Sequence, residues 1–309
     1  MVDFQLTIRK PVSVEGIGLH TGEPCRITLS PAPSSTGIVF RASDLHRTPI
    51  QAAPENVVDA RFATTLGVNG ARVRTVEHLL ASAAALGIDN LFVDVEGEEI
   101  PALDGSAEPF VALFYAAGKK TLPTPRRPLV IRKPLRVGDG MRWLQVLPAD
   151  RFRISYTLDL DHPAVGTQAL SFTCTESTFV KELAPARTYG FLKDVGTLRK
   201  NGLARGGSLD NAVVVGKRTV LNGSLRYQDE FVRHKTLDLI GDLGLLGRPM
   251  VGHVVARNAG HQLNHQLVLA ILEEHDKPSG ARGVVQGLSY PAGRADGVPR
   301  GPRTGLAAS

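Results

Sequence analysis

A helix predicted over residues 229–242 limits the possible folds and functions of this chain more than any other feature. It combines a face that packs in a core with a stripe of ionisable groups. Its apolar residues recur at three- and four-residue spacing, as they do in a helix packed against a core. On the same helix His234, Asp238 and Asp242 follow one another at intervals of four, so their side chains share one face. Burying an imidazole and two carboxylates is costly unless they bind something, and a divalent metal is the simplest partner. A catalytic metal site then needs a third protein ligand and an open position.

The positive charge of the chain is concentrated at its C-terminal end. The net charge is +6, and residues 277–309 account for +4 of it. The rest of the chain is close to neutral for its size, which argues against nucleic-acid binding. The same end holds seven glycines and four prolines without periodicity. This composition predicts a disordered tail at 276–309.

The two cysteines and the longest apolar run bear on the location of the protein. Cys25 and Cys174 are far apart and form no CxxC pattern, which is typical of a reducing compartment. Residues 79–88 form the longest apolar run, which is too short to span a bilayer. The N-terminal residues contain no apolar segment typical of a secretion signal. We therefore expect a cytoplasmic protein without stable membrane insertion.

A proline-rich basic segment divides the chain near its middle. Residues 119–128 contain three prolines and four basic residues, which is typical of a linker. We therefore predict one α+β domain over 1–125 and a second over 126–275. Each half offers strands and then a helix with a histidine near its start, which indicates an internal pseudo-repeat.

Residues 72–88 are predicted to form a short strand that leads into a helix. Thr75 is the expected N-cap and Gly87 the expected C-terminal glycine. Glu77 and His78 lie in the first turn, where a glutamate often only complements the helix dipole and a histidine is often a satisfied core residue. Beside the helix at 229–242, however, His78 supplies the missing third ligand and Glu77 a general base.

Three further residues extend this interpretation. His261 follows Gly260 and is a candidate general acid, held by a carboxylate such as Asp242. Lys235, next to His234, is placed to meet a phosphate. His20 lies in a loop with three glycines, where a surface turn and a ligand-facing loop are both open. Together these residues favour metal-assisted hydrolysis of an amide or an ester.

Seven blocks of the sequence carry a resemblance to a known family: residues 13–22, 75–78, 87–91, 100–106, 186–191, 229–242 and 260–261. In this order they closely resemble the UDP-3-O-acyl-N-acetylglucosamine deacetylases, which are zinc enzymes of lipid A biosynthesis in Gram-negative bacteria. The resemblance covers about residues 2–274. The resemblance implies removal of the N-acetyl group of UDP-3-O-acyl-N-acetylglucosamine, giving acetate and UDP-3-O-acyl-glucosamine, which is the committed step of that pathway. It also implies two related ribosomal S5-like domains, each a β-sheet packed on helices, with the active site between them.

The resemblance also implies roles for individual residues. By position, His78, His234 and Asp238 match the ligands of Zn²⁺, Glu77 the general base and His261 the general acid. Thr188 matches a residue that stabilises the oxyanion, and Lys235 and Asp242 match supporting residues. An insert at about 188–215 matches the passage for the fatty acyl chain. The expected substrate-binding residues are Lys235, Tyr189, Phe191, Leu192, Leu209, Ala212 and Val214, with Val195 as a further candidate.

Three other interpretations are weighed against this one. The first alternative is a zinc amidohydrolase that acts on a different acylated sugar. The second is a nucleic-acid-binding protein, and the third is a non-catalytic relative with structural zinc. The charge distribution disfavours the second, and the presence of ligand, acid and base candidates disfavours the third. The leading prediction remains a monomeric deacetylase whose partner is a small UDP-acyl-sugar substrate.

Overall fold

The computed structural model describes residues 3–42 and 48–276 of the chain. The predicted tail therefore lies outside the described residues, apart from Asp276, which is the last residue of a helix. The described part is a mixed α+β structure, as the sequence predicts. It contains no helix that is both long and apolar enough to cross a bilayer.

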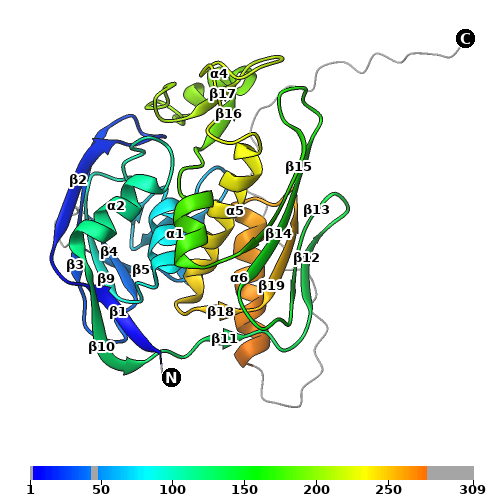
Figure 1. Ribbon diagram of the computed structural model, residues 1–309. Helices are drawn as coiled ribbons and strands as arrows, with labels where there is room; N and C mark the ends of the chain where they lie inside the picture. The colour runs from blue at the N-terminus through cyan, green and yellow to red at the C-terminus, as the bar shows by residue number, and fades with distance from the viewer. Residues whose placement is uncertain (1–2, 43–47, 277–309) are drawn as a thin grey trace, which may run out of the picture.

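Two five-stranded sheets form the outer layers of the molecule, one at each side of Figure 1. The order of strands in the first is β2 (Val12–Ile17), β3 (Pro24–Pro31), β9 (Leu91–Glu96), β4 (Ile38–Arg41) and β5 (Pro49–Gln51). The order in the second is β12 (Leu135–Asp139), β13 (Arg142–Leu147), β19 (His253–Arg257), β14 (Arg153–Leu160) and β15 (Gly166–Thr173).

The two sheets have the same topology. In each, the last strand in sequence is inserted at the centre, antiparallel to one neighbour and parallel to the other. The two outer pairs of each sheet are antiparallel. This repeat of strand order agrees with the internal pseudo-repeat indicated by the sequence.

Alternation of apolar residues turns one face of each sheet toward the core. In β3, Cys25, Ile27 and Leu29 are buried while their neighbours are more exposed, and β14 buries Ile154 and Tyr156 in the same way. This is the period-two pattern of a half-buried strand. It directs both sheets toward the helices between them.

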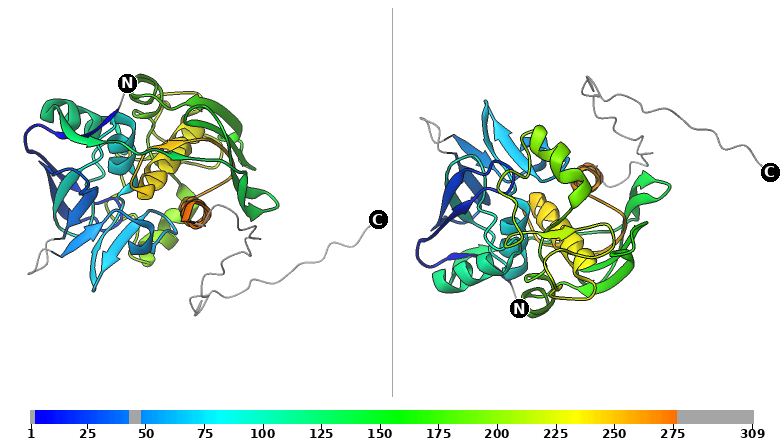
Figure 2. Two further views of the ribbon diagram at one scale, coloured as in Figure 1. Left: turned by 90° about the horizontal axis from the view of Figure 1, so that it is seen from below. Right: turned by 90° about the horizontal axis from the view of Figure 1, so that it is seen from above.

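Helices fill the space between the sheets, as Figures 1 and 2 show. These are α1 (Glu77–Leu86), α2 (Glu108–Ala117), α5 (Glu230–Leu243) and α6 (His261–Asp276). The two central helices, α1 and α5, pack directly against each other. Gly87 ends α1 in the left-handed conformation, with φ of 71°, as the sequence predicts.

Gly241 brings these two central helices into close contact. A Cβ atom at this position would lie 2.0 Å from the carbonyl oxygen of Glu77, so only glycine permits the approach. The crossing therefore places the start of α1 directly beside the last turn of α5.

We expect Gly241→Ala to lower the free energy of unfolding by roughly 1–3 kcal/mol, because the added methyl group must push the helices apart. Chemical denaturation measures this change. Gly244→Ala, one turn later, is the matched control, since its Cβ would meet side-chain carbon of Leu80 at an ordinary 3.6 Å. Equal stability of the two variants would contradict close packing at Gly241.

Smaller elements complete the described structure. They are β1 (Phe4–Ile8) paired with β10 (Lys119–Pro125), β6 (Val57–Asp59) with β7 (Thr65–Val68) and β8 (Ala71–Val73), β11 (Leu129–Val130) with β18 (Met250–Val251), and the short helices at Pro54–Asn56, α3 (Glu176–Thr178), Phe179–Leu183 and Gly244–Leu246.

The predicted linker at 119–128 is wrong over its first seven residues, because Lys119–Pro125 form β10, paired with β1. The composition is typical of a linker, but β1 and β10 form a two-stranded edge pair, where proline is tolerated. The next residue is also fixed, since Arg126 makes an ion pair with Asp89. A domain boundary between 125 and 126 stays a prediction.

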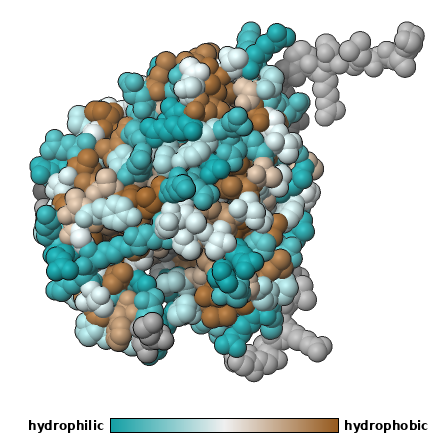
Figure 3. Space-filling view, viewed as in Figure 1, coloured by the Kyte–Doolittle hydropathy of each residue, from teal (hydrophilic) through white to brown (hydrophobic). Residues whose placement is uncertain are grey.

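The insert forms a separate lobe at the top of Figure 1. It contains β16 (Tyr189–Phe191), α4 (Leu192–Lys200) and β17 (Val213–Val215), and its two strands pair in parallel. In the space-filling view, apolar side chains gather on this lobe (Figure 3). Within residues 188–215, Leu192 and Leu209 are each half exposed.

Candidate metal centre and catalytic site

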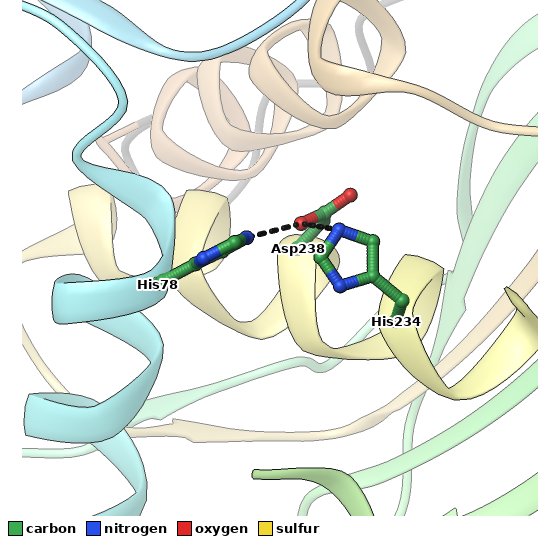
Figure 4. Close-up of side chains that lie close together, drawn as sticks. All are labelled: His78, His234 and Asp238. Atoms are coloured by element: carbon green, nitrogen blue, oxygen red, sulfur yellow. Dashed lines mark ion pairs between the residues drawn. The ribbon is translucent and has the colours of Figure 1, made fainter. Parts of the chain in front are cut away.

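Three buried side chains converge where the central helices cross. His78 comes from α1, and His234 and Asp238 come from successive turns of α5 (Figure 4). The Nε2 atoms of His78 and His234 lie 3.5 and 3.3 Å from Oδ1 of Asp238. One potential ligand atom from each residue lies within 4.8 Å of the others. The three residues predicted from sequence are therefore brought together.

The surroundings of His234 leave its Nε2 lone pair directed into the site. Its Nδ1 lies 3.2 Å from the carbonyl oxygen of Ala186, so Nδ1 carries the proton and donates it. Burial lowers the pKa of His234 to about 4. The ring is therefore neutral at neutral pH, the form in which histidine binds metals.

Asp238 supplies negative charge to the same point. Burial opposes its charged form, but the neighbouring His234 and Lys235 outweigh burial and hold the pKa of Asp238 well below its usual value. Among the described residues, Oδ1 of Asp238 is buried and has no hydrogen-bond donor. A buried, unsatisfied carboxylate oxygen facing two imidazole nitrogens fits a bound cation.

Lys235 occupies the other side of Asp238. Its ammonium group lies 2.8 Å from Oδ2, and the side chain is largely buried. Burial disfavours its positive charge, yet Asp238 outweighs burial and raises the pKa of Lys235. A fixed cation thus lies beside the candidate ligands, where the sequence predicts contact with a charged part of the substrate.

Glu77 lies beside this cluster, at the first position of α1. Its side chain is buried, and Oε2 accepts a hydrogen bond from the backbone N–H of Thr64 at 3.0 Å. Its other oxygen, Oε1, lies 4.0 Å from Nε2 of His261. Burial raises the pKa of Glu77 above its ordinary value, which makes this carboxylate a better proton acceptor.

His261 faces Glu77 from the start of α6. Its Nδ1 lies 2.8 Å from Oδ2 of Asp242, and its Nε2 lies 3.8 Å from Oδ2 of Asp238. Burial opposes protonation, but Asp242, with Glu77 and Asp238, outweighs it and raises the pKa of His261 to about 9. The ring is therefore protonated at neutral pH, with Nε2–H directed into the site.

Two residues that the sequence did not single out complete this network. The Thr64 hydroxyl donates to Oδ1 of Asp242, and the Asn264 amide donates to Oδ2 at 2.8 Å. Thr64 therefore connects Glu77, through its N–H, with Asp242, through its hydroxyl. Neither residue lies in one sequence motif with the residues it bonds. Thr64 and Asp242, for example, are 178 positions apart.

A cavity of about 1030 Å³ opens from this cluster toward the insert. All the catalytic and substrate-binding residues predicted from sequence line it except Asp242, which lies behind His261. Its walls are mainly apolar. The lining includes Thr188, Tyr189, Phe191, Leu192, Val195, Leu209, Ala212, Val214 and also Arg61, Phe62 and Met141, which the sequence analysis did not select.

Backbone hydrogen bonds hold Thr188 at the entrance to the insert. Its N–H donates to the carbonyl of Gly105 at 2.7 Å, and its carbonyl accepts from Val213 at 2.8 Å. The next residue, Tyr189, packs edge-on against Phe231 with ring centres 4.9 Å apart. The insert is thereby attached both to α5 and to the first half of the chain.

Comparisons with known proteins agree on one family. The family model described as UDP-3-O-acyl N-acetylglycosamine deacetylase matches residues 5–273. A UDP-3-O-acyl-N-acetylglucosamine deacetylase of Syntrophotalea carbinolica is 48% identical over 88% of this chain and 89% of its own length. Those of Myxococcus xanthus and Acidithiobacillus ferrooxidans are 49% and 48% identical, over 87% and 88% of this chain and 87% and 91% of their own lengths.

Proposed function

This chain belongs to the UDP-3-O-acyl-N-acetylglucosamine deacetylase family, and on that premise we propose that it removes the N-acetyl group of UDP-3-O-acyl-N-acetylglucosamine with the aid of Zn²⁺. The products are acetate and UDP-3-O-acyl-glucosamine, in the biosynthesis of lipid A. The observation that carries the proposal is the convergence of His78, His234 and Asp238 on one point, with Oδ1 of Asp238 unsatisfied.

The donor set suits zinc. Bonds of about 2.1 Å place two tetrahedral ligands roughly 3.4 Å apart, and the separations of 3.5 and 3.3 Å from Asp238 match this value. Two imidazoles and one carboxylate leave one position open, as in zinc hydrolases. Held by these three residues, zinc would supply Lewis-acid chemistry, which would polarise the acetamide carbonyl and make water nucleophilic near neutral pH.

Protein groups on either side of the ligands move the protons. We assign Glu77 as the general base, which takes a proton from the attacking water at Oε1. His261 is the general acid, which gives the proton on Nε2 to the amine nitrogen as the C–N bond breaks. Asp242 holds Nδ1 of His261 and keeps the ring protonated until that step.

Other residues of the cavity bind and orient the substrate. We assign oxyanion stabilisation to Thr188 and contact with the charged part of the substrate to Lys235. The 3-O-acyl chain extends into the insert along Tyr189, Phe191, Leu192 and the side chains of Leu209, Ala212 and Val214. The apolar walls of the cavity support this assignment, because they exclude water from a hydrocarbon chain.

The repeated strand order supports a description as two ribosomal S5-like domains, over 1–125 and 126–275, with the acyl-chain insert in the second. We propose that the enzyme is a monomer, as the sequence predicts. The nucleotide-sugar substrate supports a cytoplasmic location.

Acetate release from UDP-3-O-acyl-N-acetylglucosamine tests the function. We expect release by the zinc-loaded protein, none after a chelator has removed the metal, and recovery when Zn²⁺ is restored. Metal analysis of each sample verifies the loading. UDP-N-acetylglucosamine, which lacks the acyl chain, is the matched substrate control and is expected to react more slowly. Full acetate release by metal-free protein would contradict the zinc mechanism.

A further inference from the structure

A further buried carboxylate, that of Glu99, lies outside the groups that act on the substrate. Its side chain is fully buried, beyond the end of β9. Its oxygens accept hydrogen bonds from the N–H of His20 at 2.9 Å, the N–H and hydroxyl of Thr21, both at 2.8 Å, and the hydroxyl of Thr75 at 2.7 Å. A buried charge is retained only where such donors replace water, so this site is built around the carboxylate.

One of these bonds fixes the segment that carries the base and a metal ligand. Thr75 lies two residues before Glu77 and has φ of 59°, a left-handed conformation that is strained for a β-branched residue. The hydroxyl of Thr75 points to Oε1 of Glu99 instead of capping the helix, so the expected N-cap is wrong. Glu99 therefore stabilises the strained turn from which Glu77 and His78 project.

The other bonds fix the loop at residues 18–22, on which the insert rests. The carbonyls of Leu19 and His20 accept hydrogen bonds from the N–H groups of Gly206 and Arg205 at 3.1 and 3.2 Å. A Cβ at Gly206 would lie 2.2 Å from the carbonyl oxygen of Gly18, so the two backbones are in direct contact. Leu19 and His20 themselves line the cavity.

We propose that Glu99 is a positioning residue that couples the two parts of the active site: through Thr75 it aligns the base, and through the loop at 18–22 it seats the acyl-chain insert. The proposal rests on the deacetylase function proposed above. Because the two connections use different donors, they are separable by mutation. Loss of the Thr75 bond displaces the catalytic segment, and loss of the Thr21 bonds loosens the wall that contacts the acyl chain.

Steady-state kinetics of the full-length, zinc-loaded protein test this division. In Glu99→Gln the new NH₂ group replaces either Oε1, which accepts from the N–H of His20, or Oε2, which accepts from the N–H of Thr21 and, at 3.1 Å, also from that of His20. At least one bond is therefore lost whichever way the amide turns. We expect kcat to fall about tenfold and KM to rise about tenfold, since small misplacements of reacting groups are costly. Glu98→Gln, which removes the same charge from an exposed neighbouring side chain, is the control.

Single-donor variants separate the two effects. Thr75→Val is expected to lower kcat with little change in KM, and Thr21→Val to raise KM with little change in kcat. Thr75→Ser and Thr21→Ser keep the hydroxyl groups and are expected to restore each parameter. These four variants also decide the matter if Glu99→Gln does not fold. If both valine variants changed kcat and KM alike, or if the serine variants did not recover the wild-type values, the role of Glu99 would be merely structural.

Hydrogen exchange of the His20 and Thr21 amides gives a readout independent of turnover. We expect slow exchange of both amides in the wild-type protein and in Glu98→Gln, and faster exchange of at least one of them in Glu99→Gln. If Glu99→Gln matched Glu98→Gln in both exchange and kinetics, the proposal would be overturned. A wild-type protein that releases no acetate would instead overturn the proposed function, so the two failures are distinguishable.

Discussion

Replacing Glu77 by glutamine is expected to lower kcat about a thousandfold while the protein keeps its fold and its metal. Among the described residues, Glu77 is the only carboxylate beside the candidate ligands that can act as a base, and the substitution removes it. General-base catalysis contributes about 10²–10⁴ in rate. Glutamine keeps the shape and can still accept from the N–H of Thr64, so the start of α1 is preserved. Turnover per bound zinc measures the effect.

The matched control for this variant is Glu108→Gln. Glu108 is the first residue of α2, as Glu77 is of α1, but its side chain is exposed. It therefore reports what a carboxylate at a helix N-terminus contributes through the helix dipole alone. We expect no change in kcat. A Glu77→Gln enzyme with normal turnover would remove the role assigned to Glu77.

Replacing His261 by alanine is expected to lower kcat by about 10²–10³, because the leaving amine loses its proton donor. The pKa of about 9 means that His261 carries this proton at neutral pH in the wild-type enzyme. Metal content is expected to stay unchanged, since His261 is not among the three ligand candidates. Single-turnover measurements at saturating substrate separate this effect on chemistry from effects on binding.

Two variants define the origin of that loss. His265→Ala removes a buried histidine one turn further along α6, where its Nε2 meets the carbonyl of Pro54, and should change stability but not kcat. Asp242→Asn keeps His261 but removes the charge that holds its proton, so we expect an intermediate loss. If His261→Ala retained full turnover, another group would have to protonate the leaving nitrogen.

Helical spacing made two of the three candidate metal ligands predictable. His234 and Asp238 lie four residues apart on a helix that does form over nearly the expected range, so their shared direction followed from local geometry. His78 could be assigned only by chemistry and resemblance, because its position depends on the contact of α1 with α5. That contact requires the absent side chain of Gly241, which no local pattern reveals.

Contacts between distant segments were not predictable from the sequence. Thr64 and Asn264 both support Asp242, yet neither carries a signal that separates it from an ordinary polar residue. Thr75 had the composition of an N-cap, but Glu99 competes for its hydroxyl and Val76 occupies the cap position. At Thr75, therefore, a tertiary hydrogen bond overrode the local preference for capping the helix.

The shared topology of the two sheets has a consequence for how the enzyme loses activity. The first half of the chain brings the base and one imidazole, and the second half brings the other imidazole, the carboxylate and the acid. Neither half holds enough ligands for a catalytic zinc site by itself. Turnover therefore depends on the interface between the two halves of the chain. Any condition that separates the halves inactivates the enzyme, even if each sheet stays folded.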